Sequence, residues 1–396
     1  MGARSLLAPV LALVLIGVAA TTVGPTADTR VTDLFVYAHD ADQVLTGHQP
    51  YLDFAFEYPP LALAPIVGAG LVGTGPDTYP ITFGLLMLAA GAAVLVLTVR
   101  IARDGQRSAA WIVALAPLLT GAMVRTHFDL AALALALAAL VALTRGRPAL
   151  GFGLLGAGAM TKLLPALLLP VAIVWMLAGR RQGARRGVAV FAAVVALVSL
   201  PFLGRGELDA YAYQLERPVQ IESTPATLLF ALGGSHVTGT TTVPDSHGSN
   251  GLVDGDAPTV EAAFAVLLAA ALLTVCSLVR RAPAGERSLV LGSLAALLAF
   301  LSLGKVLSPQ FTIWVVPFAA LAWAMGERTL AVLLLAAVAL TQLEFPARYM
   351  DLVREDTGVI ALVALRNATL LGALGLTLAR LAGPARCRPH AWVATP

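Results

Sequence analysis

Apolar runs long enough to cross a lipid bilayer recur along almost the whole of this chain. They lie near residues 5–23, 79–101, 108–124, 128–144, 149–161, 164–179, 187–203, 260–279, 288–304, 308–325, 329–345 and 358–382. About 20 apolar residues cross the hydrocarbon core as a helix, because a helix satisfies its own backbone hydrogen bonds where water is absent. Only 12% of the residues are charged, about half the share in soluble domains. The pattern predicts an all-α integral membrane protein with about twelve transmembrane helices.

The basic residues suggest an orientation. If Arg4 lies in the cytoplasm and the helices alternate, the arginines near residues 100–107, 145–147, 180–186 and 280–287 fall on the same side. Most acidic residues then fall on the opposite side. We therefore expect a multi-pass protein of the inner (plasma) membrane with both ends in the cytoplasm. The first run also resembles a signal peptide, but we favour a retained first helix.

This topology makes residues 1–396 a single polytopic domain with two long outer segments, 24–78 and 204–259. The run "YPPLALAPIVGAGLVG" after Glu57 could form another helix, but a full crossing there would place Arg100 to Arg107 outside. We predict instead a juxtamembrane or re-entrant helix that begins at its prolines. Because the cytoplasmic loops are short, the function is expected on the outer face.

The first outer segment carries a candidate general base. Residues 32–45 suggest a short amphipathic helix that Thr32 caps and Gly47 ends. Asp33, Tyr37 and Asp40 then lie at i, i+4 and i+7, on one face. A carboxylate at the start of this helix, near the lipid headgroups, is suited to remove a proton from a substrate hydroxyl.

Metal and nucleotide chemistry find little support. Asp40 and Asp42 form an Asp-Ala-Asp sequence, but residues two apart on a helix point about 200° away from each other. There is no histidine cluster with metal spacing and no Gly-x-x-x-x-Gly-Lys loop. We expect no metal, no cofactor and no nucleic-acid partner.

Five basic residues outside the cytoplasmic loops are candidate ligands for an anion such as phosphate: Arg125, Lys162, Arg217, Lys305 and Arg366. An ammonium or guanidinium near the membrane surface is a good phosphate partner. The alternative for the lysines is a snorkelling anchor at a helix end. Arg366 is expected inside a helix, where a charge usually has a function; its alternative is a structural ion pair with Glu344 or another carboxylate.

Several short motifs occur in an order that resembles glycosyltransferase family 87 of the GT-C superfamily. They are Asp33-x-x-x-Tyr37, Gly47, "PYLDF", "EYPPL", "TKLLP", "ERPVQIESTPATL" and "KVLSPQFTIWVVP", which together span residues 33–317. Phe311 departs from the tyrosine that this family usually has, which puts any hydroxyl contact there in doubt.

The resemblance implies a GT-C-type bundle with juxtamembrane helices in the first periplasmic loop. It also implies an inverting hexosyltransferase of the extracytoplasmic face, with Asp33 as the base. The donor would be a polyprenyl-phosphate sugar, most commonly mannose in actinobacterial members, and the acceptor a lipid or glycan. The five cations would hold the donor phosphate. Further substrate contacts would come from Tyr37, Asp40, Tyr51, Asp53, Glu57, Tyr58 and Gln310.

Three alternatives remain at this stage. A secondary transporter fits the helix number, although its polar site would lie nearer the membrane midplane and its two halves would be comparable. A related GT-C enzyme could use arabinose or glucose, or act like an O-antigen ligase. A non-catalytic lipid-binding membrane protein is the third.

Overall fold

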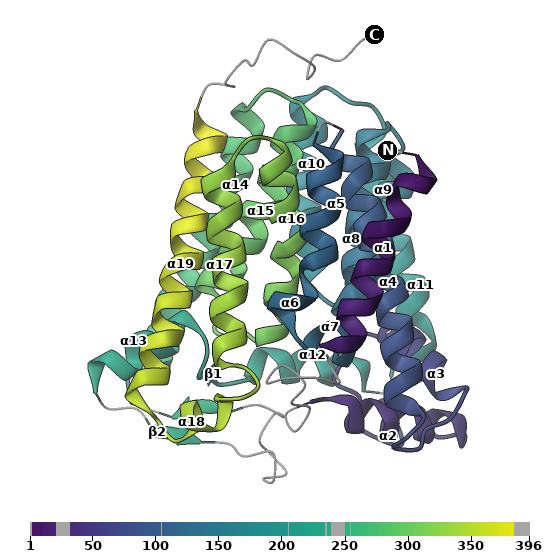
Figure 1. Cartoon of the computed structure of the whole chain (residues 1–396), viewed down its shortest axis with the longest axis vertical. Helices are drawn as coiled ribbons and strands as arrows, with labels where there is room; N and C mark the ends of the chain where they lie inside the picture. Colours follow the sequence, from purple (N-terminus) through teal and green to yellow (C-terminus); the bar gives the residue numbers. More distant parts are fainter. Residues whose placement is uncertain are drawn as a thin grey trace.

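The computed structural model describes residues 2–20, 32–103, 105–204, 206–233, 236–238, 250–253 and 255–383. In this part of the chain the architecture is an upright bundle of helices with short elements gathered at one end (Figure 1). The bundle helices are α1 (Ala3–Ala19), α4 (Tyr79–Ile101), α5 (Gln106–Leu115), α6 (Pro117–Thr120), α8 (Asp129–Thr144), α9 (Pro148–Thr161), α10 (Leu168–Ala178), α11 (Ala184–Ser199), α14 (Ala257–Arg281), α15 (Glu286–Leu303), α16 (Val315–Ala324), α17 (Arg328–Glu344) and α19 (Thr357–Ala382). The all-α membrane fold expected from the sequence is confirmed.

Five segments are long and apolar enough to cross a membrane by length and composition: α4, α11 with the turn that follows it, α14, α15 and α19. The other predicted runs form shorter helices, some extended by single 3-10 turns such as η3 (Leu164–Leu167), η4 (Leu200–Phe202) and η5 (Pro309–Trp314). Helix α15 is central, with 78% of its apolar window buried, whereas the windows of α11 and α14 are 6% and 11% buried. Exposed apolar faces of this kind are suited to lipid rather than water.

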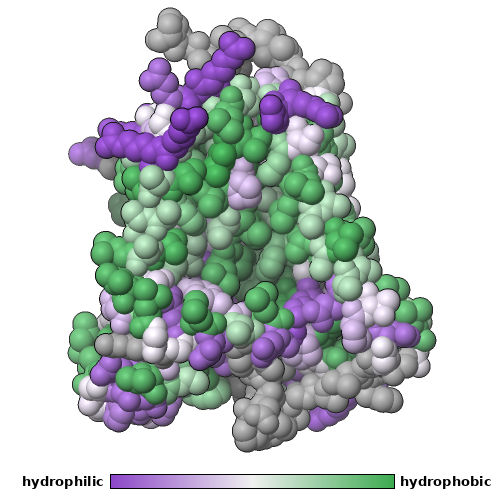
Figure 2. Space-filling view, turned by 180° about the vertical axis from the view of Figure 1, so that it is seen from behind, coloured by the Kyte–Doolittle hydropathy of each residue, from purple (hydrophilic) through white to green (hydrophobic). Residues whose placement is uncertain are grey.

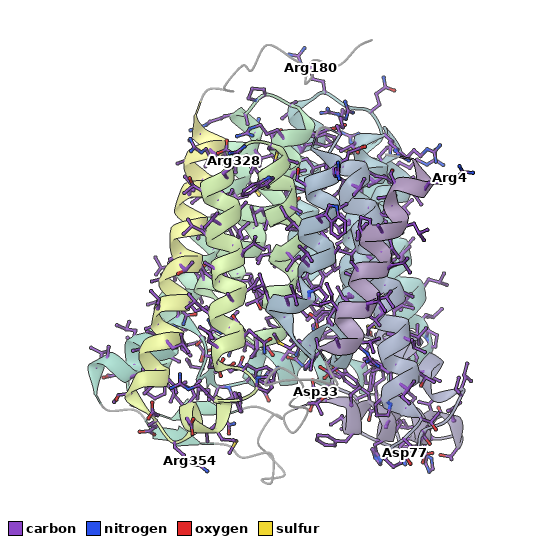
Figure 3. The ribbon with its side chains drawn as sticks, in the orientation of Figure 1. Arg4, Asp33, Asp77, Arg180, Arg328 and Arg354 are labelled. Atoms are coloured by element: carbon purple, nitrogen blue, oxygen red, sulfur yellow. The ribbon has the colours of Figure 1, made fainter. Side chains whose placement is uncertain are left out.

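The surface is divided in the same way. Figure 2 shows hydrophobic side chains across the middle of the molecule and hydrophilic side chains toward both ends. Arg4, Arg180 and Arg328 lie at one end, which we call the Arg4 end, and Asp33, Asp77 and Arg354 lie at the other, the Asp33 end (Figure 3). Helix α1 starts and α19 finishes at the Arg4 end (Figure 1).

The short elements belong to the Asp33 end (Figure 1). They are α2 (Leu34–Leu45), η2 (Pro60–Ala62), α3 (Leu63–Gly70), α7 (Met123–Thr126), α12 (Glu207–Glu216), α13 (Thr224–Leu232), α18 (Tyr349–Val353) and the strands β1 (Val219–Gln220), β2 (His236–Thr238) and β3 (Gly251–Val253). The helix predicted after Tyr58 is present as η2 and α3, and at about 12 Å α3 is too short to cross a bilayer. The antiparallel sheet, in the order β1-β3-β2, was not anticipated from the sequence.

Candidate active site

Helix α2 places Asp33 and Tyr37 together at the Asp33 end. The hydroxyl of Tyr37 donates a hydrogen bond to Oδ2 of Asp33 at 3.2 Å. Tyr37 is completely buried, whereas the Asp33 side chain is 39% exposed. The predicted cap at Thr32 is corrected by one position: Asp33 occupies the N-cap, and Thr32 Oγ1 accepts from the Leu34 amide at 3.3 Å. The Tyr37 hydroxyl thus orients a carboxylate that remains partly exposed, as a general base requires.

His127 is a neighbour of Asp33 that the sequence analysis missed. It occupies the extended connection between α7 and α8, with its Nε2 3.7 Å from Oδ2 of Asp33. Its Nδ1 lies 2.9 Å from Oγ1 of Thr126. Burial lowers the pKa of His127, although Asp33 and Asp129 act in the opposite direction. A lone histidine before an apolar run gave no spacing signal, since its partner lies 94 positions earlier in the sequence.

Aromatic rings surround this carboxylate. The Phe128 ring lies 5.5 Å from that of Tyr37 and 4.9 Å from that of Tyr58. Tyr37 and Tyr58 are also in edge contact at 5.9 Å. From the loop after α2, Tyr51 donates a hydrogen bond to the main-chain oxygen of Tyr58 at 2.5 Å. We call Tyr37, Tyr51, Phe56, Tyr58 and Phe128 the aromatic wall; offset and edge contacts of this kind make a stiff surface.

Lys162 lies on the other side of Phe128. Its Nζ is 5.0 Å from the centre of the Phe128 ring, and it donates to Oδ2 of Asp129 at 2.7 Å and to Oε1 of Gln310 at 3.1 Å. The second oxygen of Asp129 accepts from the indole nitrogen of Trp314 at 2.7 Å. Lys162 and Asp129 are both buried. The structure therefore brings Gln310 and Lys162 together, with the lysine charge already balanced by a carboxylate.

Arg217 approaches the aromatic wall from α12. Its Nη1 donates to Oε1 of Gln214 at 3.2 Å, and Gln214 in turn donates to the main-chain oxygen of Glu57 at 3.1 Å. Burial raises the pKa of Tyr58 well above its usual value; Asp33 and Glu57 raise it further, while Arg217 lowers it. Arg217 is thus connected, through Gln214, to the main chain of the residue that precedes Tyr58.

The other candidate cations have different surroundings. Lys305 donates to Glu261 and to the main-chain oxygen of Leu215, both at 2.5 Å. The guanidinium of Arg125 packs against the backbone of α4 at Gly84, where an added Cβ would lie 2.5 Å from its Nε. Arg366 is 1% exposed and bonds to Asn367 and to the main chain of Glu222. Among the described residues Arg366 has no ion pair within 4 Å, so its contacts hold the main chain and are neither those of the expected pair with Glu344 nor those of an exposed anion site.

The acidic candidate residues also differ in their surroundings. Asp40 is 5% exposed, and burial, with a smaller contribution from Glu57, raises its pKa to about 7. Asp53 is exposed and accepts from the Gln49 amide at 2.7 Å, so that it caps its own turn. Asp42 accepts from the Thr74 hydroxyl at 2.9 Å. Among the described residues there is no group of three or more His, Cys, Asp or Glu side chains suited to a metal ion.

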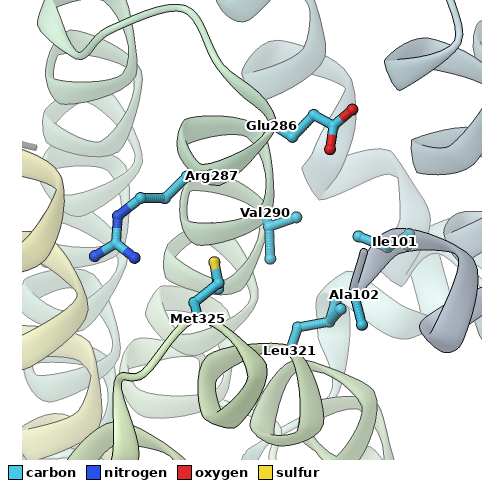
Figure 4. A pocket seen from close by; sticks show the side chains of 7 residues that line it. All are labelled: Ile101, Ala102, Glu286, Arg287, Val290, Leu321 and Met325. Atoms are coloured by element: carbon cyan, nitrogen blue, oxygen red, sulfur yellow. The ribbon is translucent and has the colours of Figure 1, made fainter. Parts of the chain in front are cut away.

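A small cavity at the opposite end of the bundle is a poor rival site. Figure 4 shows Glu286, Arg287 and five apolar side chains around it, and its volume is about 10 Å³. A space of that size holds at most a single water molecule. Both charged residues are engaged elsewhere, Glu286 with Arg103 and Arg287 with Glu327.

The fold is that of a helical membrane protein with a cluster of a carboxylate, a histidine, cations and aromatic rings at one end. Residues 56–304 match the model of glycosyltransferase family 87. This range covers more than half of the 396 residues, so the chain belongs to that family and is a membrane glycosyltransferase. No curated protein matches the chain. The matched range contains "EYPPL", "TKLLP" and "ERPVQIESTPATL" but neither Asp33 nor "SPQF".

Proposed function

We propose that this glycosyltransferase moves a hexose, with mannose the favoured sugar, from a polyprenyl-phosphate donor to a lipid or glycan acceptor on the extracytoplasmic face. Orientation is supported by the arginines Arg4, Arg180 and Arg328 at the end opposite Asp33 (Figure 3). Nucleotide sugars are not supplied outside the cell, so a donor activated by a lipid phosphate suits a site at that face. Family membership favours this reaction over the transporter alternative.

The observation that carries the proposal is the partly exposed Asp33 carboxylate, which has the Tyr37 hydroxyl 3.2 Å and Nε2 of His127 3.7 Å from its Oδ2. Asp33 is open enough to meet an acceptor hydroxyl, and it is oriented by Tyr37. In the reaction the acceptor oxygen attacks the anomeric carbon while its proton passes to the Asp33 carboxylate. The bond from the anomeric carbon to the phosphate oxygen breaks on the opposite face, which inverts the configuration.

The departing phosphate gains negative charge and needs a cation. Arg217 is the best placed of the five candidates, because its Nε is buried without a hydrogen-bond partner among the described residues and its Nη1 is linked through Gln214 to the main chain of Glu57, next to Tyr58. Lys162 is second: Asp129 balances its charge, but the ammonium has three donors and two of them are used. Tyr51, Glu57 and Tyr58 would line the sugar side of the site.

The proposal is tested with the purified protein in lipid nanodiscs. Short-chain polyprenyl phosphates that carry radiolabelled mannose, glucose or arabinose are offered with a bacterial membrane-lipid extract as the acceptor source. Asp33→Asn is compared with wild type and with Asp77→Asn, which removes an exposed carboxylate at the same end. Loss of a base costs roughly 10²–10⁴-fold in rate.

We expect transfer from the mannose donor, loss of that transfer in Asp33→Asn, and wild-type rates in Asp77→Asn. Equal rates in Asp33→Asn and wild type would shift the role of base to Asp40 or Asp53. Transfer from glucose or arabinose alone would correct the sugar, and no transfer from any of the three donors would reject this donor class.

A further inference from the structure

A second group of charged side chains is buried away from the aromatic wall, where the segment after α12 meets α17 and α19. It consists of Glu222, Glu344 and Arg366, which are 0%, 1% and 1% exposed. We call these three residues the Arg366 cluster. Ionised groups are rarely buried to this extent unless they are paired, so the charge state of the cluster needs a physical explanation.

The cluster holds the main chain rather than forming a simple ion pair. Arg366 donates through Nη2 to the main-chain oxygen of Glu222, and Asn367 donates to the same oxygen at 3.2 Å. Oε2 of the Glu222 side chain accepts from Gln220 at 2.8 Å. Nη1 of Arg366, Oε1 of Glu222 and both carboxyl oxygens of Glu344 have no hydrogen-bond partner among the described residues.

Two carboxyl groups and one guanidinium are thus buried together, and among the described residues no ion pair within 4 Å joins them. Arginine keeps its proton in proteins, so one ionised carboxylate is sufficient to balance it. A second carboxylate would be an uncompensated buried charge, which costs several kcal/mol. Burial raises the pKa of Glu222 well above its usual value and Glu344 raises it further, whereas Arg366 and, more weakly, Arg217 lower it. Burial, followed by Glu222, raises the pKa of Tyr349 on α18, whose hydroxyl accepts from Asn250 at 2.9 Å.

The chain that leaves the cluster leads directly to the candidate site. Between Arg217 and Glu222, the Gln220 amide donates to the main-chain oxygen of Lys305 at 2.9 Å and the Ile221 amide donates to that of Asn250 at 3.2 Å. The segment is thus fixed at its middle by backbone bonds and at its far end by Arg366. Arg217, at its near end, donates to Gln214, which in turn donates to the main-chain oxygen of Glu57 beside Tyr58.

We propose that Glu222 and Glu344 hold one proton between them and, with Arg366, form a neutral clamp that positions Arg217 beside the aromatic wall. The proton and the clamp are properties of the fold itself. The consequence for catalysis rests on the proposed function, in which Arg217 binds the donor phosphate. Arg366 and the two glutamates are positioning residues, since their contacts are with the chain and not with substrate.

The charge state is tested without any activity assay. In infrared spectra at pH 7, an Asp40→Asn background removes the other carboxyl group whose pKa is raised to about 7. This background shows a protonated-carboxyl band that is lost when Glu222→Gln or Glu344→Gln is added, because the remaining acid then ionises against Arg366. Each single glutamine variant keeps its Tm within about 2 °C, whereas the double variant leaves Arg366 without a counter-charge and loses more than about 5 °C. Adding Arg366→Met to the double variant recovers much of this loss. Arg354→Met removes an exposed arginine paired with Asp351 and leaves Tm unchanged.

The positioning role is tested by hydrogen exchange and by kinetics. Arg366→Met raises the amide exchange rate over residues 217–222 and lowers kcat/KM for the lipid donor by about tenfold, mainly through KM. In an Arg217→Ala background the same change costs less than about twofold, because the positioned group is already absent.

Different results overturn different parts of the proposal. A protonated-carboxyl band that persists in both glutamine variants of the Asp40→Asn background, or is missing from that background itself, would exclude the shared proton. Unchanged exchange over residues 217–222 in Arg366→Met would exclude the clamp. An equal loss of kcat/KM in both backgrounds would reduce the cluster to a general stabilising role. If the protein transfers no sugar, the spectra, Tm values and exchange rates still decide the clamp, and only the proposed function fails.

Discussion

Nε2 of His127 lies 3.7 Å from Oδ2 of Asp33, the same oxygen that accepts a hydrogen bond from the Tyr37 hydroxyl. This separation is longer than a hydrogen bond, yet short enough for a strong electrostatic effect in a buried setting. Catalytic hydrogen bonds are often long without substrate and shorten in the reacting complex. Burial lowers the pKa of His127, which favours the neutral ring. When the Thr126 hydroxyl donates to Nδ1, the neutral ring carries its proton on Nε2 and can donate to Asp33 as the Tyr37 hydroxyl does.

His127→Leu should therefore slow transfer and change its pH dependence. The Asp33 carboxylate loses a donor that favours its ionised form, so the acidic limb of the kcat/KM profile moves to higher pH. We expect a loss of about tenfold at neutral pH and a smaller loss at pH 8. His39→Leu on α2 is the control. An acidic limb that stays in place would show that His127 does not act on Asp33.

Asp40 gives a second pH-dependent prediction. Burial, with Glu57, raises its pKa from 3.8 to about 7. A group whose folded pKa is raised favours the folded state most below its unfolded pKa, and this contribution is lost as pH rises toward the folded value. Wild-type Tm should therefore fall between about pH 4 and pH 7 by an amount that Asp40→Asn removes. At pH 8 the Asp40→Asn variant should melt a few degrees above wild type. A Tm of the variant below that of wild type at this pH would contradict the raised pKa of Asp40.

The sequence predicted the helices well because their signal is local. Each long apolar run satisfies its backbone internally wherever it is placed in the bundle, and Gly47, with φ of 99°, ends α2 where expected. The face shared by Asp33 and Tyr37 followed from helical spacing alone, and their hydrogen bond realises it. The strands β1, β2 and β3 were missed, because strands of two or three residues carry no periodicity.

The site was harder to predict than the fold, because the partners of its charged residues are distant in the sequence and come together only in the folded chain. Lys162 and Lys305 have similar local sequences, yet one is balanced by Asp129 and the other by Glu261. No local sequence pattern near either lysine indicates its ion-pair partner, since the partners lie 33 and 44 positions away. His127 likewise gained its importance only when α2 was placed beside α7 and α8.

Gly84 offers a probe of Arg125. A methyl group at this position would lie 2.5 Å from Nε and 2.6 Å from Nη2 of Arg125, so Gly84→Ala must displace the guanidinium. If Arg125 contributes to donor binding, KM for the lipid donor should rise by about fivefold, which corresponds to about 1 kcal/mol. Gly372→Ala on α19 is the control: its new methyl group meets no atom within 4 Å, so it should leave KM unchanged and stabilise the helix by roughly 0.5–1 kcal/mol. Unchanged KM in both variants would remove Arg125 from the site.

Substitutions in the buried pair of Lys162 and Asp129 distinguish a structural role of Lys162 from a role in donor binding. Asp129→Asn leaves the Lys162 ammonium buried without its 2.7 Å partner, and breaking a buried pair in this way costs about 3–5 kcal/mol. Asp129→Asn combined with Lys162→Met removes both charges and should recover most of the lost Tm. If Lys162 also meets the donor phosphate, the double variant will be stable but transfer sugar at least tenfold more slowly than wild type. The matching change at the more exposed pair, Glu261→Gln with Lys305→Met, should alter the free energy of unfolding by no more than about 1 kcal/mol. Full activity in the stable Asp129 and Lys162 double variant would confine Lys162 to a structural role and leave Arg217 as the leading phosphate ligand.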